Sequence, residues 1–521
     1  MAQDAREAQR NELFKTIWGI ADEVRGAVDG WDFKSYILCF LFYRFISEDI
    51  AEFIDEGERE AGDESFSYAE LSDEDAEAAR EDVTKEKGFF ILPSQLFQNI
   101  AIAPDKDPEL NVHIKEIFNS IEASSVGTAS EDSFKGLFDD VDVTSNRLGA
   151  DLTERNARLA KIIEGIRNLD FGSVRDAHID LFGDAYEYLM NMYASGAGKS
   201  GGEFFTPQEV SELLARIVIG DRTSLSKVYD PACGSGSLLL KFAKFLGSEN
   251  VRVGFFGQEI NPTTYNLCRM NMFLHHINFD RFNIARGDTL INPYHWDDEP
   301  FDAIVSNPPY STKWVGDEDP TLINDPRFSP AGVLAPKSKA DLAFTMHMLS
   351  WLSASGKAAI VEFPGVLYRG GAEQKIRKYL VDSNFVEAVI QLPANLFFGV
   401  TIAVCVIVLS KSKQDDRVLF VDASEEFIHV GNKNKLSPEN IQRIYETVHG
   451  RSEEEHFAKL VGIDEIGGEN AYSLSVGTYV EKRDTREKID IDELNKRIAD
   501  IVAREQELRE QIDAIVADLE A

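Results

Sequence analysis

The stretch Val228-Tyr-Asp-Pro-Ala-Cys-Gly-Ser-Gly-Ser237 decides the fold of this chain. It begins in a short β-rich segment at residues 227–230 and leads into the helical pattern Leu238-Leu-Leu-Lys-Phe-Ala-Lys-Phe245. Gly234 and Gly236 let the backbone turn sharply and let a ligand approach the main chain closely. The stretch therefore predicts a strand, a ligand-binding loop and a helix of an α/β fold.

Other β-rich segments extend this unit along the chain. They occupy residues 253–257, 301–306, 358–363, 386–391 and 401–409, and amphipathic stretches separate most of them. Strands that alternate with helices predict a doubly wound, mostly parallel sheet covered on both faces. We place this Rossmann-like catalytic domain at residues 166–410.

The flanking regions differ from the centre in their patterns. Residues 1–165 are predicted to be an all-α domain, because apolar residues surround most of each turn between Trp31 and Ile46. Residues 411–480 form a mixed, polar extension. Residues 481–521 are predicted to be an amphipathic tail helix for subunit packing, with a coiled-coil-type seam. The seam consists of Ile491, Leu494, Ile498, Ile501, Leu508, Ile512, Ile515 and Leu519, with Glu505 at the one missing position. The spacing leaves open whether the seam packs on its own chain or on another subunit.

The composition limits the choice of partners. The chain has 54 basic and 90 acidic residues, a net charge of −36, and 43% hydrophobic residues. Wholesale disorder is excluded, and bare DNA is repelled at long range, so nucleic-acid contacts must be local or supplied by a basic partner. The run at 48–87, with 17 acidic and 4 basic residues, is interpreted as a solvated surface rather than a partner site.

The four cysteines are scattered, and the longest apolar run has ten residues, Val400 to Leu409. Neither a disulfide framework, nor a metal site, nor a membrane span is therefore predicted. A reducing, cytoplasmic location is expected.

The acid that follows the glycine loop indicates a nucleoside cofactor. Glu259 lies 23 residues after Gly236, at the end of the next β-rich segment, where doubly wound folds bind ribose hydroxyls. Leu239 replaces the third glycine of a dinucleotide loop, and no Walker lysine follows. Asp230 can accept from a cationic amine or an amide. S-adenosyl-L-methionine fits this pattern, because it has a ribose, an amino-acid end and a sulfonium but no phosphate.

The motif Asn307-Pro308-Pro309-Tyr310 follows the β-rich segment 301–306 and carries the predicted chemistry. Prolines fix the backbone at a strand's carboxyl end, where ligands bind in such sheets. The Asn307 side-chain oxygen and the Pro308 carbonyl can accept the N–H groups of a ring-conjugated amine and turn its lone pair toward a methyl donor. Tyr310 can stack on the base, which must be flipped out of a duplex. An ordinary turn is the competing interpretation.

These motifs, in this order, resemble the amino-group DNA methyltransferases, and more closely the modification (M) subunit of type I restriction–modification systems of the IC branch. Further matching segments are Gly198-Lys-Ser-Gly-Gly-Glu-Phe-Phe-Thr-Pro207, Gly257-Gln-Glu-Ile-Asn-Pro262, Pro336-Lys-Ser-Lys-Ala-Asp341 and Tyr368-Arg-Gly-Gly-Ala-Glu-Gln-Lys-Ile-Arg377. Outside the centre, Trp31-Asp-Phe33, Phe42-Tyr-Arg-Phe-Ile-Ser47 and Tyr472-Ser-Leu-Ser-Val-Gly-Thr-Tyr-Val480 also match.

The resemblance implies S-adenosyl-L-methionine-dependent methylation of the adenine 6-amino group in double-stranded DNA, which protects host DNA from cleavage. It implies a complex of two modification subunits with one specificity (S) subunit, joined by restriction (R) subunits when the system cleaves. It also implies cofactor contacts: the methionine end at Glu203, Phe204, Phe205, Thr206, Pro207 and Gln208, the backbone of Gly234, Ser235 and Gly236, the ribose at Glu259, and the adenine amino group at Asp288. Related enzymes place a second base-stacking aromatic at Phe397-Phe398, which favours Phe398; core packing is the alternative.

No segment resembles a large target-recognition domain, since only 112 residues follow Leu409, and no run of five or more basic residues occurs. We therefore expect a partner to choose the DNA sequence. Lys337, Lys339 and Arg369 are the candidate phosphate contacts, with surface solvation as the alternative.

Two other functions remain open at this stage. One is a protein methyltransferase acting on glutamine amides, which also uses Asn-Pro-Pro-Tyr but is shorter and lacks the Glu203–Pro207 segment and the heptad tail. The other is a non-catalytic assembly or DNA-mimic subunit with a vestigial cofactor fold. Cys233 is expected to be a small buried residue, and His275 and His276 are expected to be structural.

Overall fold

The computed structural model describes residues 13–17, 19, 32–171, 181–196, 206–397, 399–482 and 491–520. The chain divides into two compact units, Met1–Val480 and Glu481–Ala521. No helix in the described ranges is both long enough and apolar enough to cross a membrane.

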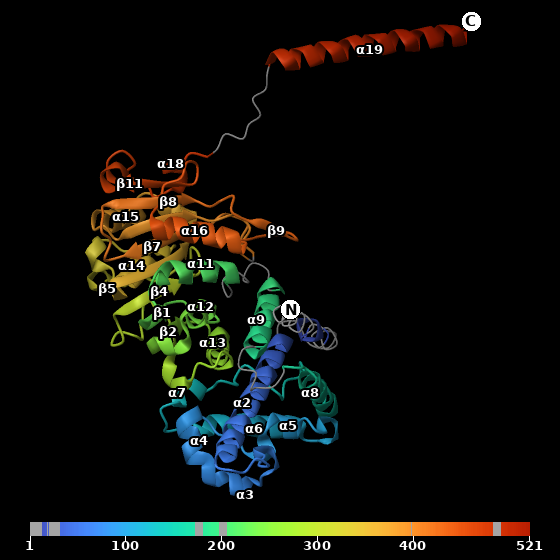
Figure 1. Ribbon diagram of the computed structural model, residues 1–521, viewed down its shortest axis with the longest axis vertical. Helices are drawn as coiled ribbons and strands as arrows, with labels where there is room; N and C mark the ends of the chain where they lie inside the picture. The colour runs from blue at the N-terminus through green and yellow to red at the C-terminus, as the bar shows by residue number, and fades with distance from the viewer. Residues whose placement is uncertain are drawn as a thin grey trace. The chain divides into compact units, whose positions relative to one another are not determined.

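A nine-stranded mixed sheet forms the centre of the first unit, in the order β11-β8-β6-β7-β5-β4-β1-β2-β3 (Figure 1). Strands β1 to β5 run parallel, β7 is antiparallel to both β5 and β6, β8 is parallel to β6, and β11 is antiparallel to β8. The strand bounds are β1 Leu225–Asp230, β2 Val251–Glu259, β3 Phe282–Arg286, β4 Phe301–Ser306, β5 Leu352–Glu362, β6 Val386–Gln391, β7 Cys405–Ser410, β8 Arg417–Asp422 and β11 Ala458–Gly462. The predicted doubly wound, mostly parallel sheet is confirmed.

The chain order along the sheet reverses between β1 and β4. From β1 the chain builds outward through β2 and β3, and it then returns to place β4 and β5 on the other side of β1. Ligands of open α/β sheets bind at the carboxyl ends of the strands beside such a switch point. The glycine loop after β1 and the Asn307–Tyr310 motif after β4 therefore meet at this point.

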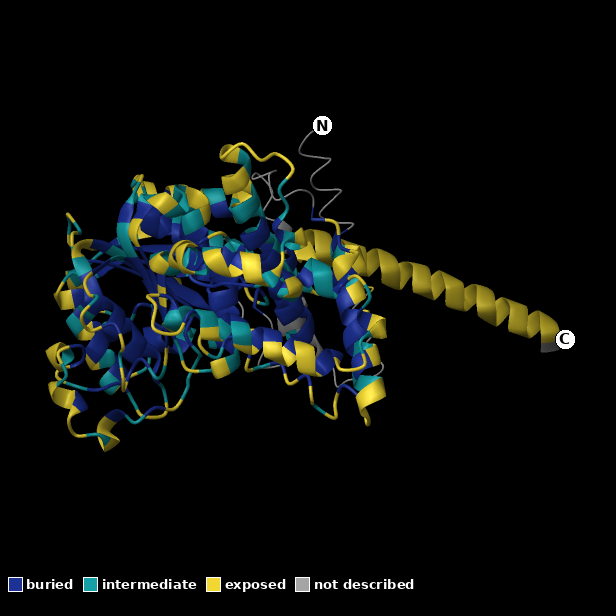
Figure 2. Cartoon of the chain, turned by 90° about the horizontal axis from the view of Figure 1, so that it is seen from below, coloured by how far each residue is buried: buried dark blue, intermediate teal, exposed yellow. Residues whose placement is uncertain are grey.

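Helices cover both faces of the sheet because strand residues alternate between two apolar cores. Val228 and Val305 belong to one core, whereas Tyr229 and Ile304 belong to the other. The first core also contains residues of α11 (Gln208–Ile219), α12 (Ser237–Leu246), α13 (Pro262–Leu274) and α16 (Pro438–Gly450). The second contains residues of α14 (Asp341–Trp351), α15 (Ala372–Asp382), α17 (Ile463–Gly467) and α18 (Val476–Tyr479). The strands between these helices are buried (Figure 2).

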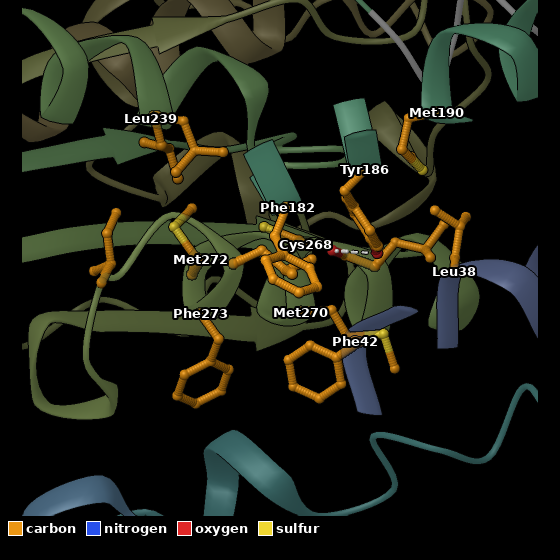
Figure 3. Close-up of a cluster of buried hydrophobic side chains, with 14 of the residues drawn as sticks. Leu38, Phe42, Phe182, Tyr186, Met190, Leu239, Cys268, Met270, Met272 and Phe273 are labelled. Atoms are coloured by element: carbon orange, nitrogen blue, oxygen red, sulfur yellow. Dashed lines mark hydrogen bonds between the residues drawn. The ribbon is translucent and has the colours of Figure 1, made fainter. Parts of the chain in front are cut away.

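The part before the sheet is helical, as predicted. Its helices are α2 (Asp32–Glu60), α3 (Asp73–Ala76), α4 (Arg80–Lys87), α5 (Phe97–Ile100), α6 (Leu110–Ser124), α7 (Glu131–Phe134), α8 (Leu152–Arg167) and α9 (Leu181–Gly196). Residues of α2, α9, α12 and α13 pack together in the first core (Figure 3). The Phe42 and Phe273 ring centroids lie 6.1 Å apart, and Tyr186 donates to the Leu267 carbonyl at 3.1 Å. The helical region and the α13 side of the sheet therefore share one apolar core.

Residues 411–480 contain more regular structure than their polar composition suggests. Strands β8 and β11 extend the sheet, α16 packs on it, and a small hairpin pairs β9 (Ile428–Val430) with β10 (Lys433–Lys435). Short polar loops separate these elements, which is why the composition of the whole stretch looks mixed.

The second unit contains the helix α19 (Ile491–Glu520). All eight apolar residues of the predicted seam are exposed, from 44% at Leu494 to 82% at Leu519. The predicted C-terminal helix is confirmed.

Candidate active site

The Asn307 side chain is held at both ends at the carboxyl end of β4. Its Nδ2 donates to Thr206 Oγ1 at 3.1 Å, and its Oδ1 accepts from the Tyr310 hydroxyl at 2.7 Å. Asn307 is only 8% exposed. Because a carbonyl oxygen has two lone pairs, Oδ1 can accept a second hydrogen bond from a ligand. The structure thus orients the amide with an acceptor available.

Tyr310 lies beside a second aromatic ring. Its ring centroid is 6.4 Å from that of Phe397, in an edge-to-face arrangement at 78°. Burial raises the pKa of Tyr310 well above its ordinary value, so the hydroxyl stays a neutral donor to Asn307. The predicted second stacking residue, Phe398, lies outside the described residues, whereas its neighbour Phe397 is buried against Tyr310.

The backbone after Tyr310 is fixed by the first residue of α14. Ser311 has a left-handed backbone with a φ of 50°, and its N–H donates to Asp341 Oδ1 at 2.9 Å. The Ala340 N–H donates to the Thr312 carbonyl at 2.9 Å. Asp341 is the last residue of the Pro336–Asp341 segment, which sequence analysis noted only as a shared motif. Its role in bracing the Asn307–Tyr310 loop was missed.

The glycine loop after β1 is tightly packed. Gly234 and Gly236 have φ values of 54° and 80°, and a Cβ at Gly236 would lie 2.8 Å from Cys268 Sγ. Glu259, at the end of β2, accepts from the Gly234 N–H at 3.0 Å and from the Asn261 N–H at 2.7 Å. Burial raises the pKa of Glu259 above its ordinary value. The structure therefore brings together the loop and the acid that were predicted to bind a nucleoside.

Asp230 lies at the base of this loop with one carboxylate oxygen unsatisfied. Its Oδ1 accepts from the Ala232 N–H at 3.0 Å and from the Ser306 hydroxyl at 2.8 Å. Its buried Oδ2 has no hydrogen-bond partner among the described residues. Burial raises the pKa of Asp230 to about 7, against the lowering effect of its two hydrogen bonds.

Gln208, the first residue of α11, is the other candidate with unsatisfied polar atoms. Its side-chain oxygen and nitrogen are both buried and lack partners among the described residues. Thr206 and Pro207, which precede it, are buried, whereas Glu203, Phe204 and Phe205 lie outside the described residues. The unsatisfied Asp230 carboxylate oxygen can bind an ammonium group, and the Gln208 side-chain amide can bind a carboxylate. S-adenosyl-L-methionine has both groups at its amino-acid end, so these residues suit it.

The loop that carries Asp288 is positioned by an arginine that sequence analysis missed. Asp288 Oδ1 accepts from the Leu290 N–H at 2.9 Å. The guanidinium of Arg327, which is 1% exposed, donates to the carbonyls of Thr289 and Leu290, both at 2.8 Å, and pairs with Asp325 at 2.8 Å. No motif marks Arg327, because it lies in a long irregular segment after Tyr310. It links that segment to the predicted adenine-binding loop.

The three predicted phosphate contacts interact with acidic residues. Lys337 pairs with Glu318 at 2.8 Å, and both side chains are exposed. Arg369 pairs with the buried Glu373 at 3.4 Å and lies 5.3 Å from the Phe363 ring centroid. Burial raises the pKa of Glu373, and the charges of Arg369 and Lys339 act against that rise, so Lys339 lies in the same region.

Cys233 and His276 pack against neighbouring residues of the fold. Cys233 is buried, as expected, and its Sγ would lie 2.9 Å from a Cβ at Gly257. His276, with a φ of 55°, packs its ring 5.5 Å from that of Phe45.

Comparison with known proteins assigns similarity to nearly the whole chain. Residues 177–488 match the N-6 DNA Methylase family, and residues 13–166 match the HsdM N-terminal domain. The chain is 49% identical over 531 residues to the type I restriction enzyme MpnII methylase subunit of Mycoplasma pneumoniae, which covers 99% of this chain and 97% of that protein. It is 29% identical to the MjaVII methylase subunit of Methanocaldococcus jannaschii, over 99% of this chain and 85% of that protein.

Among solved structures, the methyltransferase subunit of a type I restriction–modification system from Streptococcus thermophilus superposes with a TM-score of 0.82 at 34% identity. The superposition covers 91% of this chain and all of that one. The residues matched by the two families include the helical region, the sheet and both candidate motifs.

Proposed function

The chain belongs to the N-6 DNA methylase family, as a methylase subunit of the type I restriction–modification kind, and on this premise we propose its substrate, its site and its partners. It is an N6-adenine DNA methyltransferase of an S-adenosyl-L-methionine-dependent family. We propose that it methylates the 6-amino group of an adenine flipped out of the duplex, at a sequence chosen by a specificity subunit.

The fixed amide of Asn307 carries this proposal. Thr206 and Tyr310 hold it so that Oδ1 is the acceptor, and the Pro308 carbonyl follows it in the same rigid turn. Together these two oxygens would accept both N–H groups of the adenine amine and direct its lone pair away from them, toward the methyl donor. Neither oxygen must act as a strong base, because the nitrogen releases its proton after it has gained the methyl group. Tyr310 would stack on the base.

The cofactor would lie between the β1 and β4 ends. S-adenosyl-L-methionine, when bound, supplies a methyl group activated by a sulfonium. Asp230 Oδ2 and the Gln208 amide would bind its amino-acid end, since both are buried without partners among the described residues. Gly234, Ser235 and Gly236 would approach it with the backbone, Glu259 would bind the ribose, and Asp288 would bind the adenine amino group.

The partners are inferred from the family and from the exposed tail. We propose that two copies of this chain assemble with one specificity subunit, and with restriction subunits when the complex cleaves DNA. The seam on α19 is a surface for such packing, because its apolar residues are exposed at heptad spacing.

The test is to co-express the chain with a specificity subunit from the same source and to map N6-methyladenine by sequencing. We expect methylation at one bipartite or continuous sequence, and none when Asn307 is replaced by alanine. Asn307→Asp is the matched variant, since it keeps an acceptor oxygen but loses the N–H donor to Thr206 Oγ1. Methylation that is undiminished in Asn307→Ala, or a labelled methyl group found on protein instead of DNA, would contradict the proposal.

A further inference from the structure

A small two-stranded ribbon stands beside the aromatic side of the site. It pairs β9 with β10 in antiparallel register, with Val430 opposite Lys433 and Ile428 opposite Lys435. The turn is formed by Gly431, with a φ of 60°, and Asn432. The ribbon extends away from the main sheet (Figure 1). Ile428 and Val430 are 47% and 52% exposed, and they lie two residues apart on β9.

The ribbon is fastened to the loop that carries Phe397. Lys433 Nζ donates to the Phe397 carbonyl at 2.7 Å, and Asn434 Nδ2 donates to the Ala394 carbonyl at 2.8 Å. In return, Asn395 Nδ2 donates to the Asn432 carbonyl at 2.8 Å. Since the Phe397 ring packs against Tyr310, these bonds fix the ribbon relative to the place where the target base would bind.

The charge of the ribbon is opposite to that of the chain. Residues 428–435 contain two lysines and a histidine and no acid, in a chain of net charge −36. Lys435 is exposed and forms no ion pair among the residues that the structure describes. Burial raises the pKa of the half-buried Glu209 carboxylate, and the charge of Lys435 acts against that rise without an ion pair between the two side chains. Lys337 and Arg369, by contrast, are already paired with Glu318 and Glu373.

Both lysines lie on the same face of the ribbon as the exposed aliphatic residues. Residues directly opposite each other in an antiparallel pair share a face, and so do residues two apart on one strand. Ile428, Val430 and Lys435 are therefore exposed on one face of the ribbon, and Lys433 on the same face is bound to the Phe397 carbonyl. A two-stranded ribbon of this kind fits a DNA groove, where lysine meets phosphate and aliphatic groups meet sugars and thymine methyl groups.

We propose that the β9–β10 ribbon contacts the DNA duplex beside the flipped adenine, with Lys435 bound to a backbone phosphate and Val430 packed in the groove. This inference rests on the proposed function, because it needs an extruded base next to Tyr310. It explains how a strongly acidic subunit holds DNA near its site: the contact is local and lies on a projecting element.

The experiment uses the complex of this chain with its specificity subunit and a labelled duplex that contains the recognised site. DNA affinity is measured by fluorescence anisotropy over a series of salt concentrations. The variants are Lys435→Ala, Lys435→Glu and Val430→Asp. The control is Lys459→Glu, which reverses an exposed lysine on the edge strand β11; Lys459 lies 4.0 Å from Glu465, so it is less free than Lys435 to bind a phosphate.

We expect Lys435→Ala to reduce the slope of log affinity against log salt by about 1, as the loss of one phosphate contact does. Lys435→Glu and Val430→Asp should weaken DNA binding by about tenfold or more at low salt, whereas Lys459→Glu should not. Cofactor affinity and the melting temperature should match those of the wild type, because these side chains are exposed.

Hairpin variants that bind DNA with the wild-type affinity and salt slope would overturn the inference. This failure is distinct from failure of the proposed function. If the wild-type complex produces no N6-methyladenine, the proposed function fails; if it methylates DNA and the ribbon variants methylate and bind equally well, only the role of the ribbon fails.

Discussion

Asp230 is the residue whose environment makes the clearest prediction about cofactor binding. Its pKa in the free chain is about 7, and its unsatisfied Oδ2 is the proposed partner of the cofactor's ammonium group. Below pH 7 the free chain holds a proton on this carboxyl, and binding a cation there must release it. Cofactor affinity should therefore rise with pH up to about 7 and then level off, by about tenfold per pH unit on the rising side.

Calorimetry in buffers of different ionisation enthalpy measures both the affinity and the released proton. In Asp230→Asn the hydrogen bonds from Ala232 and Ser306 can remain, but the titration is lost, so the affinity should be low and independent of pH. A wild-type dissociation constant that stays constant from pH 5.5 to pH 7 would show that Asp230 does not bind the ammonium group.

Tyr310 makes a second prediction, because its ring and its hydroxyl have separate roles. Tyr310→Phe keeps the ring but removes the donor to Asn307 Oδ1, a bond of 2.7 Å. The loss of one such bond is worth about 1 kcal/mol, so kcat should fall about fivefold while KM for the cofactor is unchanged. Tyr310→Ala also removes the stacking surface and should be far less active. Steady-state methylation of a duplex measures the activity of both variants. Equal rates for Tyr310→Phe and Tyr310→Ala would mean that the ring contributes nothing.

The buried Arg327 side chain connects the loop of Asp288 to the segment that contains Asp325, and we expect the loop of Asp288 to depend on it. Lysine cannot reproduce a guanidinium that donates to Thr289 and Leu290 and pairs with Asp325. In Arg327→Lys the loop of Asp288 should lose its fixed position, which should raise KM for the cofactor by about tenfold with a smaller change in kcat.

Arg269→Lys is the matched control, because Arg269 is equally buried and also donates to two carbonyls, those of Asp132 and Lys135, outside the site. Both variants should be less stable to urea, but only Arg327→Lys should raise KM. A similar rise in both would indicate a general loss of stability instead of a positioning role.

At the scale of elements, the site residues that could be predicted from the sequence are those that lie beside buried, apolar strands. Strands β1 and β4, which precede the glycine loop and Asn307–Tyr310, are mostly buried, and Glu259 is the last residue of β2. A strand buried on both faces has a nearly continuous apolar sequence, which makes it easy to predict. Strand β3 was missed because it is short and its residues Asn283 and Arg286 are exposed. Arg327 and Asp341 were not assigned roles, since their partners are backbone groups that tertiary folding alone brings near.

The turn from β1 into α12 depends on a glycine, Gly236, that has no room for a side chain. Gly236 has a φ of 80°, and an added Cβ would lie 2.8 Å from Cys268 Sγ and 2.9 Å from Met272 Cε. Gly236→Ala therefore combines left-handed strain of about 1–2 kcal/mol with overpacking against α13. We expect the free energy of unfolding in urea to fall by about 2–4 kcal/mol and cofactor binding to be lost.

Gly477→Ala is the control for this substitution. Gly477 lies in α18 with no atom within 4 Å of its added Cβ, and its φ is not positive. Alanine there should be neutral or slightly stabilising, by less than about 1 kcal/mol. If Gly236→Ala unfolds at the wild-type urea concentration, the loop is more adaptable than its packing indicates.

At the scale of the whole molecule, the chain divides into two compact units, Met1–Val480 and Glu481–Ala521. The first unit contains every described residue of the candidate site, and the second is a helix with an exposed apolar seam. The heptad spacing predicted the tail helix. It could not identify what covers the seam, because a heptad pattern specifies a helical partner without naming it.

The seam makes the last prediction, since eight exposed apolar side chains on one helix are stable in water only when a partner covers them. Ile512→Asp places a charge in the C-terminal half of the seam and should prevent assembly with the specificity subunit, as measured by size-exclusion chromatography with light scattering. Lys496→Asp, between Leu494 and Ile498 but off the seam, should leave assembly intact. Because the site lies in the first unit, Ile512→Asp should still bind the cofactor with wild-type affinity while losing sequence-specific methylation. A variant that assembles normally would show that subunits join through another surface, and one that fails to bind the cofactor would show that the two units depend on each other.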